Sequence, residues 1–429
     1  MHVSTVFTAL SLMRPGVDVD VAAGGRTEVR GGVAPLYPGA STSRPMAAVA
    51  LTPAFAFRLA SPRWSVLLRY HPRLFWRFPN RLDLDRPLVL HQASGSYGHA
   101  LTRRWSLNVD TNAAIGEVDY TALGLVFPGV QSTLPNTGVL SYANISAMGW
   151  LGVQLARRHR LRFGGGGGRS GPLDYVDTSS DPEDGVPDRA VIPTQVRGNA
   201  AVEYMYAASR RDDVQATGGI TSIDFSTSQH YLVSSIVLGW AHRFSRTTDG
   251  VLRGGTWVVQ LLESRDDEPL KNPVIPVADI GVRSQLHGSQ RVRLSGTAGA
   301  SMTGYVDPIF ALVEPRAGGT LGLALEFPPD WTARVEATMY TAATARPRTA
   351  PALSPAGVAV LFDQTLFAAS LPITWEFAKF AALEFGARFT ARAPHLRADN
   401  WELHRVEAWG YAALIVMFGT DGRGLDWVP

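Results

Sequence analysis

The feature that most constrains the fold of this chain is a regular alternation of apolar and polar side chains. It is clear over residues 105–116, 320–327, 334–340 and 383–392. It recurs from residue 405 to 418 but is weaker in the second half of that stretch, where Ala413, Ile415 and Met417 make both faces apolar. Successive side chains of a β-strand point to opposite faces, so each stretch predicts a strand with one apolar and one polar face. The strand segments that contain these stretches run about 12 to 16 residues, against roughly 5 to 6 for a strand of a soluble protein.

Short polar turns divide these stretches at regular intervals. The eight turns lie near Ser61-Pro62-Arg63, Thr102-Arg103-Arg104, Arg157-Arg158-His159, Ser209-Arg210-Arg211, Arg246 to Gly250, His287-Gly288-Ser289, Pro328-Pro329-Asp330 and Ala378-Lys379. The connections between them are longer and rich in Pro, Gly, Ser and Asp. Short connections join antiparallel strands as hairpins. Eight hairpins, one strand before them over residues 17–33 and one after them over residues 405–418 predict about eighteen strands, with both ends on the short-turn side.

Composition separates the possible classes of all-β protein. No run approaches the about 20 apolar residues of a membrane-spanning helix. Charged residues make up 18% of the chain, below the roughly 25% of a soluble domain. Trp64, Trp105, Trp331 and Trp375 lie within a few residues of short turns, where a membrane interface favours aromatic rings. A β-propeller would need four short strands in each repeat, and a sandwich is usually far smaller. We therefore expect a closed antiparallel transmembrane β-barrel over residues 17–418.

The polar faces of these strands supply the candidate lining of the barrel lumen. The candidates are Arg69, Asp110, Arg160, Arg162, Arg197, Glu203, Asp279, Arg283, Arg291, Arg293, Glu326, Arg334, Glu336, Glu384, Arg388, Arg392, Arg405 and Glu407. Facing rows of arginine and carboxylate can form a charged constriction that orients a solute. They can equally pair into ladders that stiffen the wall, which is the more common role. The excess of arginine favours an anionic or sugar-like cargo.

Other motifs carry less information. The segment from Asp174 to Asp188 has carboxylates that could hold a hard cation such as Ca²⁺, although an acidic surface loop is the commoner explanation. The run Gly164 to Gly168 matches a dinucleotide-binding pattern only because it is rich in glycine, and we expect it to let a strand kink or let another group pack closely on the wall. The chain has no cysteine and no nucleophile elbow or zinc-protease motif. We expect no enzyme, metal or cofactor.

The pattern resembles that of bacterial outer-membrane β-barrel proteins over essentially the whole chain, in a porin-like or polysaccharide-export-type form. Such barrels commonly end on an aromatic residue; here Phe418 ends the last alternating stretch and residues 419–429 follow it as a periplasmic tail. Residues 1–16 are expected to be a signal-peptide remnant or a disordered segment, because Val3 to Met13 is largely apolar but has no basic residue before it.

The resemblance implies a location in the outer membrane, with its lipid as partner, and a passage for hydrophilic solutes. Periplasmic export components would be further partners if the cargo is a sugar polymer. A net charge of +3 gives no support for nucleic acid. Two other classes stay open: a structural or surface-interaction barrel without transport, and a barrel enzyme.

Overall fold

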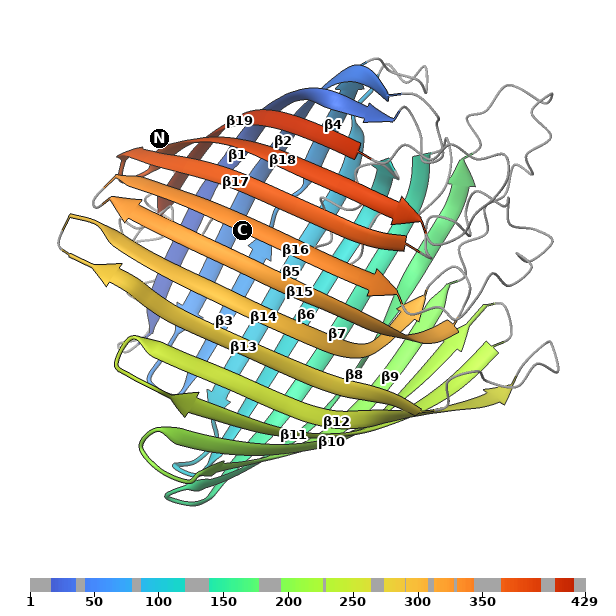
Figure 1. Ribbon diagram of the computed structural model, residues 1–429, viewed down its shortest axis with the longest axis vertical. Helices are drawn as coiled ribbons and strands as arrows, with labels where there is room; N and C mark the ends of the chain where they lie inside the picture. The colour runs from blue at the N-terminus through green and yellow to red at the C-terminus, as the bar shows by residue number, and fades with distance from the viewer. Residues whose placement is uncertain are drawn as a thin grey trace.

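The computed structural model describes residues 17–35, 43–78, 86–119, 139–176, 194–226, 229–263, 274–289, 291–307, 312–327, 330–342, 364–394 and 406–419. Its elements are all β-strands (Figure 1). In chain order they are β1(Asp18–Pro35), β2(Ser43–Ala60), β3(Trp64–Tyr70), β4(Arg73–Phe78), β5(Leu88–Ala100), β6(Trp105–Asp119), β7(Val139–Ala156), β8(His159–Val176), β9(Gln195–Ala207), β10(Asp212–Phe225), β11(Gln229–Arg243), β12(Thr248–Glu263), β13(Val274–Gly288), β14(Arg293–Asp307), β15(Leu312–Phe327), β16(Trp331–Ala342), β17(Gln364–Ala378), β18(Ala381–Pro394) and β19(Val406–Gly419). The described residues include no helix long and apolar enough to span a membrane.

The strands form a single closed sheet. Each pairs antiparallel with its neighbours in the chain, and β1 pairs with both β2 and β19. Both β3 and β4 lie between β2 and β5, so they are two halves of one broken strand. The wall therefore has eighteen strand positions, and the prediction of an antiparallel barrel of about eighteen strands is confirmed.

The break between β3 and β4 falls at His71 and Pro72. Proline has no backbone N–H and cannot donate to the ladder, which interrupts the pairing. The backbone N–H of His71 still donates to the carbonyl oxygen of Gln92 at 2.9 Å. The wall thus loses regular pairing over a short distance only.

All eight short turns lie at one end of the barrel, together with the start of β1 and the end of β19 (Figure 1). Four of them are shorter than the sequence indicates, because residue 159 belongs to β8, residues 248–250 to β12, residues 287–288 to β13 and residue 378 to β17. The last strand extends to Gly419, one residue beyond the expected end of the barrel. Residues 1–16 and 420–429 lie outside the described residues, as does most of the acidic segment 174–188.

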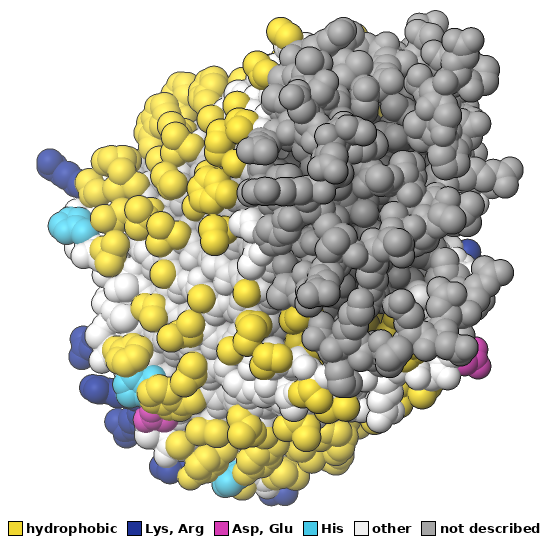
Figure 2. Space-filling model, turned by 45° about the vertical axis from the view of Figure 1, so that its right-hand side comes forward, with side chains coloured by type: hydrophobic (Ala, Val, Ile, Leu, Met, Phe, Trp, Pro, Cys, Tyr) yellow, Lys and Arg dark blue, Asp and Glu magenta, His cyan; other side chains and the backbone are white. Residues whose placement is uncertain are grey.

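Apolar side chains are the commonest coloured side chains on the described part of the face that Figure 2 shows, with few charged ones among them. The side chain of Ile236 is 65% exposed, and those of Val29, Leu321 and Phe385 are also exposed. The residues immediately before and after each of these four point to the opposite face of the wall. The opposite face carries charged groups such as Glu28, which is only 7% exposed. The two faces are therefore segregated as the alternation predicts.

Several apolar clusters on the inner face depart from this rule, on β2, β4 and β5, on β1, β2 and β19, and on β10 to β13. Near the ends of β10 to β13 that lie away from the short turns, the inward positions are apolar and buried, among them Phe225, Tyr231, Val259 and Ile275. Phe225 and Tyr231 meet edge to face, with ring centroids 6.0 Å apart. The interior thus combines polar portions with apolar clusters, and a uniformly polar lining is not correct.

The outward position at the middle of β11 tests the placement of this wall in lipid. The substitution Ile236→Arg should lower the free energy of unfolding by about 2 to 4 kcal/mol, because it puts a charge at the centre of the apolar belt. The neighbouring Val237→Arg points into the lumen and should cost much less. Urea unfolding of both variants in lipid vesicles measures the difference, and equal losses would contradict the assigned faces.

Candidate functional site

Most of the predicted lumen residues lie on the inner face of the barrel. This group comprises Arg69, Asp110, Arg160, Arg162, Arg197, Glu203, Asp279, Arg283, Arg293, Glu326, Arg334, Glu336, Glu384, Arg388 and Glu407, which alternate with outward apolar side chains. Arg291 lies in the turn before β14, where it is exposed, and so does not belong to a strand. Arg405 is outside the described residues, and the side chain of Arg392 in β18 is also not described.

Several inner-face charges pair across neighbouring strands. Arg162 of β8 forms a salt bridge with Glu203 of β9 at 3.2 Å. Arg253 of β12 lies 3.5 Å from Asp279 of β13. Such pairs neutralise one another and stiffen the wall, which is the ladder role considered for these residues.

A denser group of charges lies where the barrel closes, and we call it the charged seam. It consists of Arg26, Glu28 and Arg30 of β1, Arg73 of β4, and Glu384 and Arg388 of β18. The guanidinium group of Arg26 donates to the carboxylate of Glu28 and to that of Glu384, both at 2.9 Å. Glu28 also interacts electrostatically with Arg30 and Arg388, and Arg73 interacts with Glu28.

The pairing register explains how strands so far apart in sequence come together in the seam. Glu28 lies opposite Ala413 of β19, and Ala413 lies opposite Glu384. The alanine between the two carboxylates is small, so Arg26 can reach both of them. Closure of the sheet therefore assembles the seam, because β1 and β18 each flank β19.

Aromatic rings hold the arginines of the seam in place. The guanidinium carbon of Arg30 lies 4.8 Å from the ring centroid of Phe75 and 5.5 Å from that of Trp409. Arg388 lies 4.9 Å from the ring centroid of Tyr411. A ring face attracts a cation without cancelling its charge. Four arginines face two glutamates, which leaves an excess of two positive charges in the seam.

Three stacked arginines of the inner wall share one local arrangement. In each, an aromatic residue lies opposite a glycine of the next strand, and an arginine two residues from that glycine stacks on the ring. The sets are Trp150, Gly164 and Arg162; Tyr340, Gly318 and Arg316; and Tyr411, Gly386 and Arg388. A Cβ atom at position 164 would lie 2.6 Å from the ring of Trp150, and one at position 386 would collide with the ring of Tyr411. Glycine at positions 164 and 386 therefore lets the rings of Trp150 and Tyr411 lie flat on the wall.

The sequence indicates only part of the seam. Glu384 and Arg388 were among the candidates, whereas Arg26, Glu28, Arg30 and Arg73 were not. The signal for the first three was present, since they occupy alternate positions of a strand that was expected over residues 17–33. Arg73 was harder to find, because it follows the Pro72 break in a strand of only six residues.

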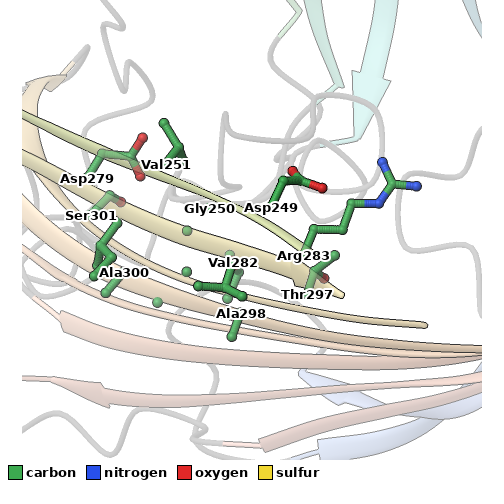
Figure 3. Close-up of a pocket in the computed structure, with 15 residues that line it drawn as sticks. Asp249, Gly250, Val251, Asp279, Val282, Arg283, Thr297, Ala298, Ala300 and Ser301 are labelled. Carbon is green, nitrogen blue, oxygen red and sulfur yellow. The ribbon is translucent and has the colours of Figure 1, made fainter. Parts of the chain in front are cut away.

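A hollow of about 320 Å³ lies against β12 to β15, away from the charged seam (Figure 3). Asp249 and Arg283 rise from neighbouring strands on the same side of the wall, and Asp279, Thr297 and Ser301 add polar groups. Its floor is made of glycine and alanine. The described residues contain no group of three or more His, Asp or Glu side chains placed to hold a metal ion.

Solved structures of three outer-membrane proteins are similar to this chain in shape. Acinetobacter baumannii OccAB4 has 9% identity and a TM-score of 0.44, with 93% of this chain and 98% of that chain covered. Pseudomonas aeruginosa OccK2 in complex with glucuronate has 9% identity and a TM-score of 0.44, covering 94% and 98%. The outer-membrane protein opdK from Pseudomonas aeruginosa has 8% identity and a TM-score of 0.45, covering 94% and 99%. Likeness at this level is one of general barrel architecture only.

No protein-family model matches the chain, and no curated protein matches its sequence. The class of the molecule follows from its own structure. A closed antiparallel barrel with an even number of strands, an apolar exterior and short turns at one end is an outer-membrane β-barrel. The chain is therefore a bacterial outer-membrane β-barrel protein, with its polar groups gathered on the inner wall.

Two neighbouring glycines of β8 test the packing of the stacked arginines. The substitution Gly164→Ala should lower the free energy of unfolding by about 1 to 3 kcal/mol, because the added methyl group meets the ring of Trp150. At Gly165 the nearest atom to an added Cβ is 3.8 Å away, so Gly165→Ala is the matched control and should be tolerated. The urea concentration at the midpoint of unfolding, measured in detergent, compares the two variants. A smaller loss of stability for Gly164→Ala than for Gly165→Ala would be inconsistent with this packing.

Proposed function

We propose that the protein is a channel for small hydrophilic solutes and that it prefers those with negative charge. Barrels of 16 to 18 strands leave room for an aqueous channel inside the wall. The observation that carries the preference for anions is the charged seam, with four arginines and two glutamates on one part of the inner face.

The composition of the seam suits both the attraction of an anion and its release. Its excess of two positive charges raises the local concentration of anions, and the apolar wall behind it focuses this field. The guanidinium groups can replace part of the water shell of a carboxylate or phosphate. Glu28 and Glu384 keep the net charge low, which favours escape of a bound anion, as conduction requires.

The arrangement of the rings supports a transport role for the arginines. The guanidinium group of Arg388 stacks on the ring of Tyr411, which fixes its face, and the edge of a stacked guanidinium group can still donate hydrogen bonds. No feature of the described wall favours a sugar polymer over a small solute, so the proposal is limited to small solutes.

Conductance in a planar bilayer tests this proposal. The purified protein should open a pore with a reversal potential that indicates anion preference in a potassium chloride gradient. The double variant R30Q/R388Q removes the two excess charges of the seam, and its permeability ratio of chloride to potassium should fall toward one.

The control variant R160Q/R334Q removes the same charge from inner-wall positions outside the seam and should retain most of the preference. An equal loss in both variants would show that total lumen charge matters and that the seam has no special role. A folded protein without conductance would favour a structural or surface-interaction barrel.

A further inference from the structure

The short turns at one end of the barrel share a repeated construction. In five of them the first residue is a serine or threonine: Ser61, Thr102, Ser209, Ser245 and Ser289. The backbone N–H of this residue donates to the carbonyl oxygen three positions later, over 2.7 to 3.2 Å. Its side-chain oxygen accepts from the backbone N–H two positions later, at 2.9 to 3.3 Å. In four of the five turns the residue at that position is an arginine.

Hydrogen bonds also join successive turns into a continuous rim. Ala100 donates its backbone N–H to the carbonyl oxygen of Arg63 at 2.7 Å, and Gln154 donates to that of Arg104 at 2.8 Å. The same contact joins Ala207 to Arg158 and Arg243 to Arg211, at 2.9 and 2.8 Å. The backbone of each arginine-bearing turn is therefore fixed relative to the next.

The side chains of these arginines are exposed at the rim, and that of Arg158 donates a hydrogen bond to the carbonyl oxygen of Ala208 at 3.5 Å. Ten arginines in or beside the described turns are exposed, including the pairs Arg103 and Arg104, Arg157 and Arg158, and Arg210 and Arg211. None of these six forms a salt bridge within the described part of the chain. Exposed acids at the same end are Asp18, Asp213, Asp249, Asp330 and Glu376. The carboxylate of Asp212 is already hydrogen-bonded to the side chains of Ser209, Trp240 and His242.

The basic turns cover only part of the circumference. They connect strands from β2 to β14, and we call them the arginine arc. Between β15 and β19 the same end instead carries aromatic pairs: Trp331 and Trp375 stack at 5.4 Å, and Phe380 and Phe418 stack at 5.1 Å. This difference gives the rim a basic side and an aromatic side.

A polar aromatic belt on the outer face places the arc at the level of lipid headgroups. His99 is hydrogen-bonded to Tyr97 at 2.7 Å, and His159 is hydrogen-bonded to Tyr204 at 2.6 Å. Tyrosine and tryptophan favour the membrane interface because their rings are apolar with one polar atom. Arginine and histidine side chains gather at the margin of the apolar surface, away from the grey region (Figure 2).

From these observations we propose that the arginine arc binds the phosphate groups of anionic glycerophospholipids in the leaflet on the short-turn side. The planar guanidinium group pairs with phosphate through two parallel hydrogen bonds, and adjacent arginines offer two such groups. The apolar belt continues directly from the arc, so a lipid bound there keeps its acyl chains against the barrel. In outer-membrane barrels the short turns face the periplasm. The proposal does not depend on transport by the lumen.

Lipid retention by the purified, folded protein tests this proposal. Native mass spectrometry after exchange into mixed micelles should show retained phosphatidylglycerol in preference to phosphatidylcholine. The variant R103Q/R104Q/R157Q/R158Q should bind phosphatidylglycerol about tenfold more weakly. Its unfolding temperature without added lipid shows whether the barrel itself is intact.

The single variant R86Q is the control, because Arg86 is exposed before β5 at the other end of the barrel and pairs with Glu117 at 2.5 Å. It should retain phosphatidylglycerol like the unmodified protein. The proposal is overturned if the fourfold variant also retains it fully, or if R86Q loses as much. Loss of peptidoglycan co-sedimentation in the fourfold variant without loss of lipid would assign the arc to a different partner.

Discussion

In a lipid bilayer no water is available to the backbone, so every N–H and C=O group of the wall must find a partner in the sheet. The chain meets this requirement by pairing its first strand with its last, over twelve residue pairs from Ala22 with Gly419 to Val33 with Ala408. The same contact creates the charged seam, because it carries Arg26 and Glu28 to within reach of Glu384. Closure of the barrel and assembly of the candidate site are therefore one event, because only the closed sheet places β1 beside β19 and so brings Arg26 and Glu28 near Glu384 of β18.

The architecture was predictable because it depends on local signals. Period-two alternation gives the strands, and the recurrent short turns give their number and the end at which both chain termini lie. The broken strand was not predictable in this way, since Pro72 splits it into a seven-residue and a six-residue piece, neither long enough to show a clear pattern. The apolar inward cluster around Tyr231 was also missed, because alternation identifies two faces but does not state that the inner one is polar throughout.

The candidate site was less predictable than the fold because it depends on register between strands. Alternation shows that Glu384 and Arg388 share a face, but their partner Arg26 is 358 positions away from Glu384 in the chain. The glycine run at 164–168 shows the same limit. The expectation of a close approach at this run agrees with the ring of Trp150 over Gly164, yet only the register identifies the residue that makes it.

The use of arginine in place of lysine connects the inner and outer surfaces. Of the forty basic residues only Lys271 and Lys379 are lysines. In the lumen a guanidinium group must lie flat on a ring and still donate hydrogen bonds from its edge, which the compact ammonium group of lysine cannot do. At the short turns the same planar group suits a phosphate with two acceptor oxygens. The inner seam is partly compensated by two glutamates, whereas the paired arginines of the rim have no salt bridge among the described residues. This contrast follows from their surroundings, because charges enclosed by the wall need counter-charges in the protein, while those at the headgroup level can take them from lipid.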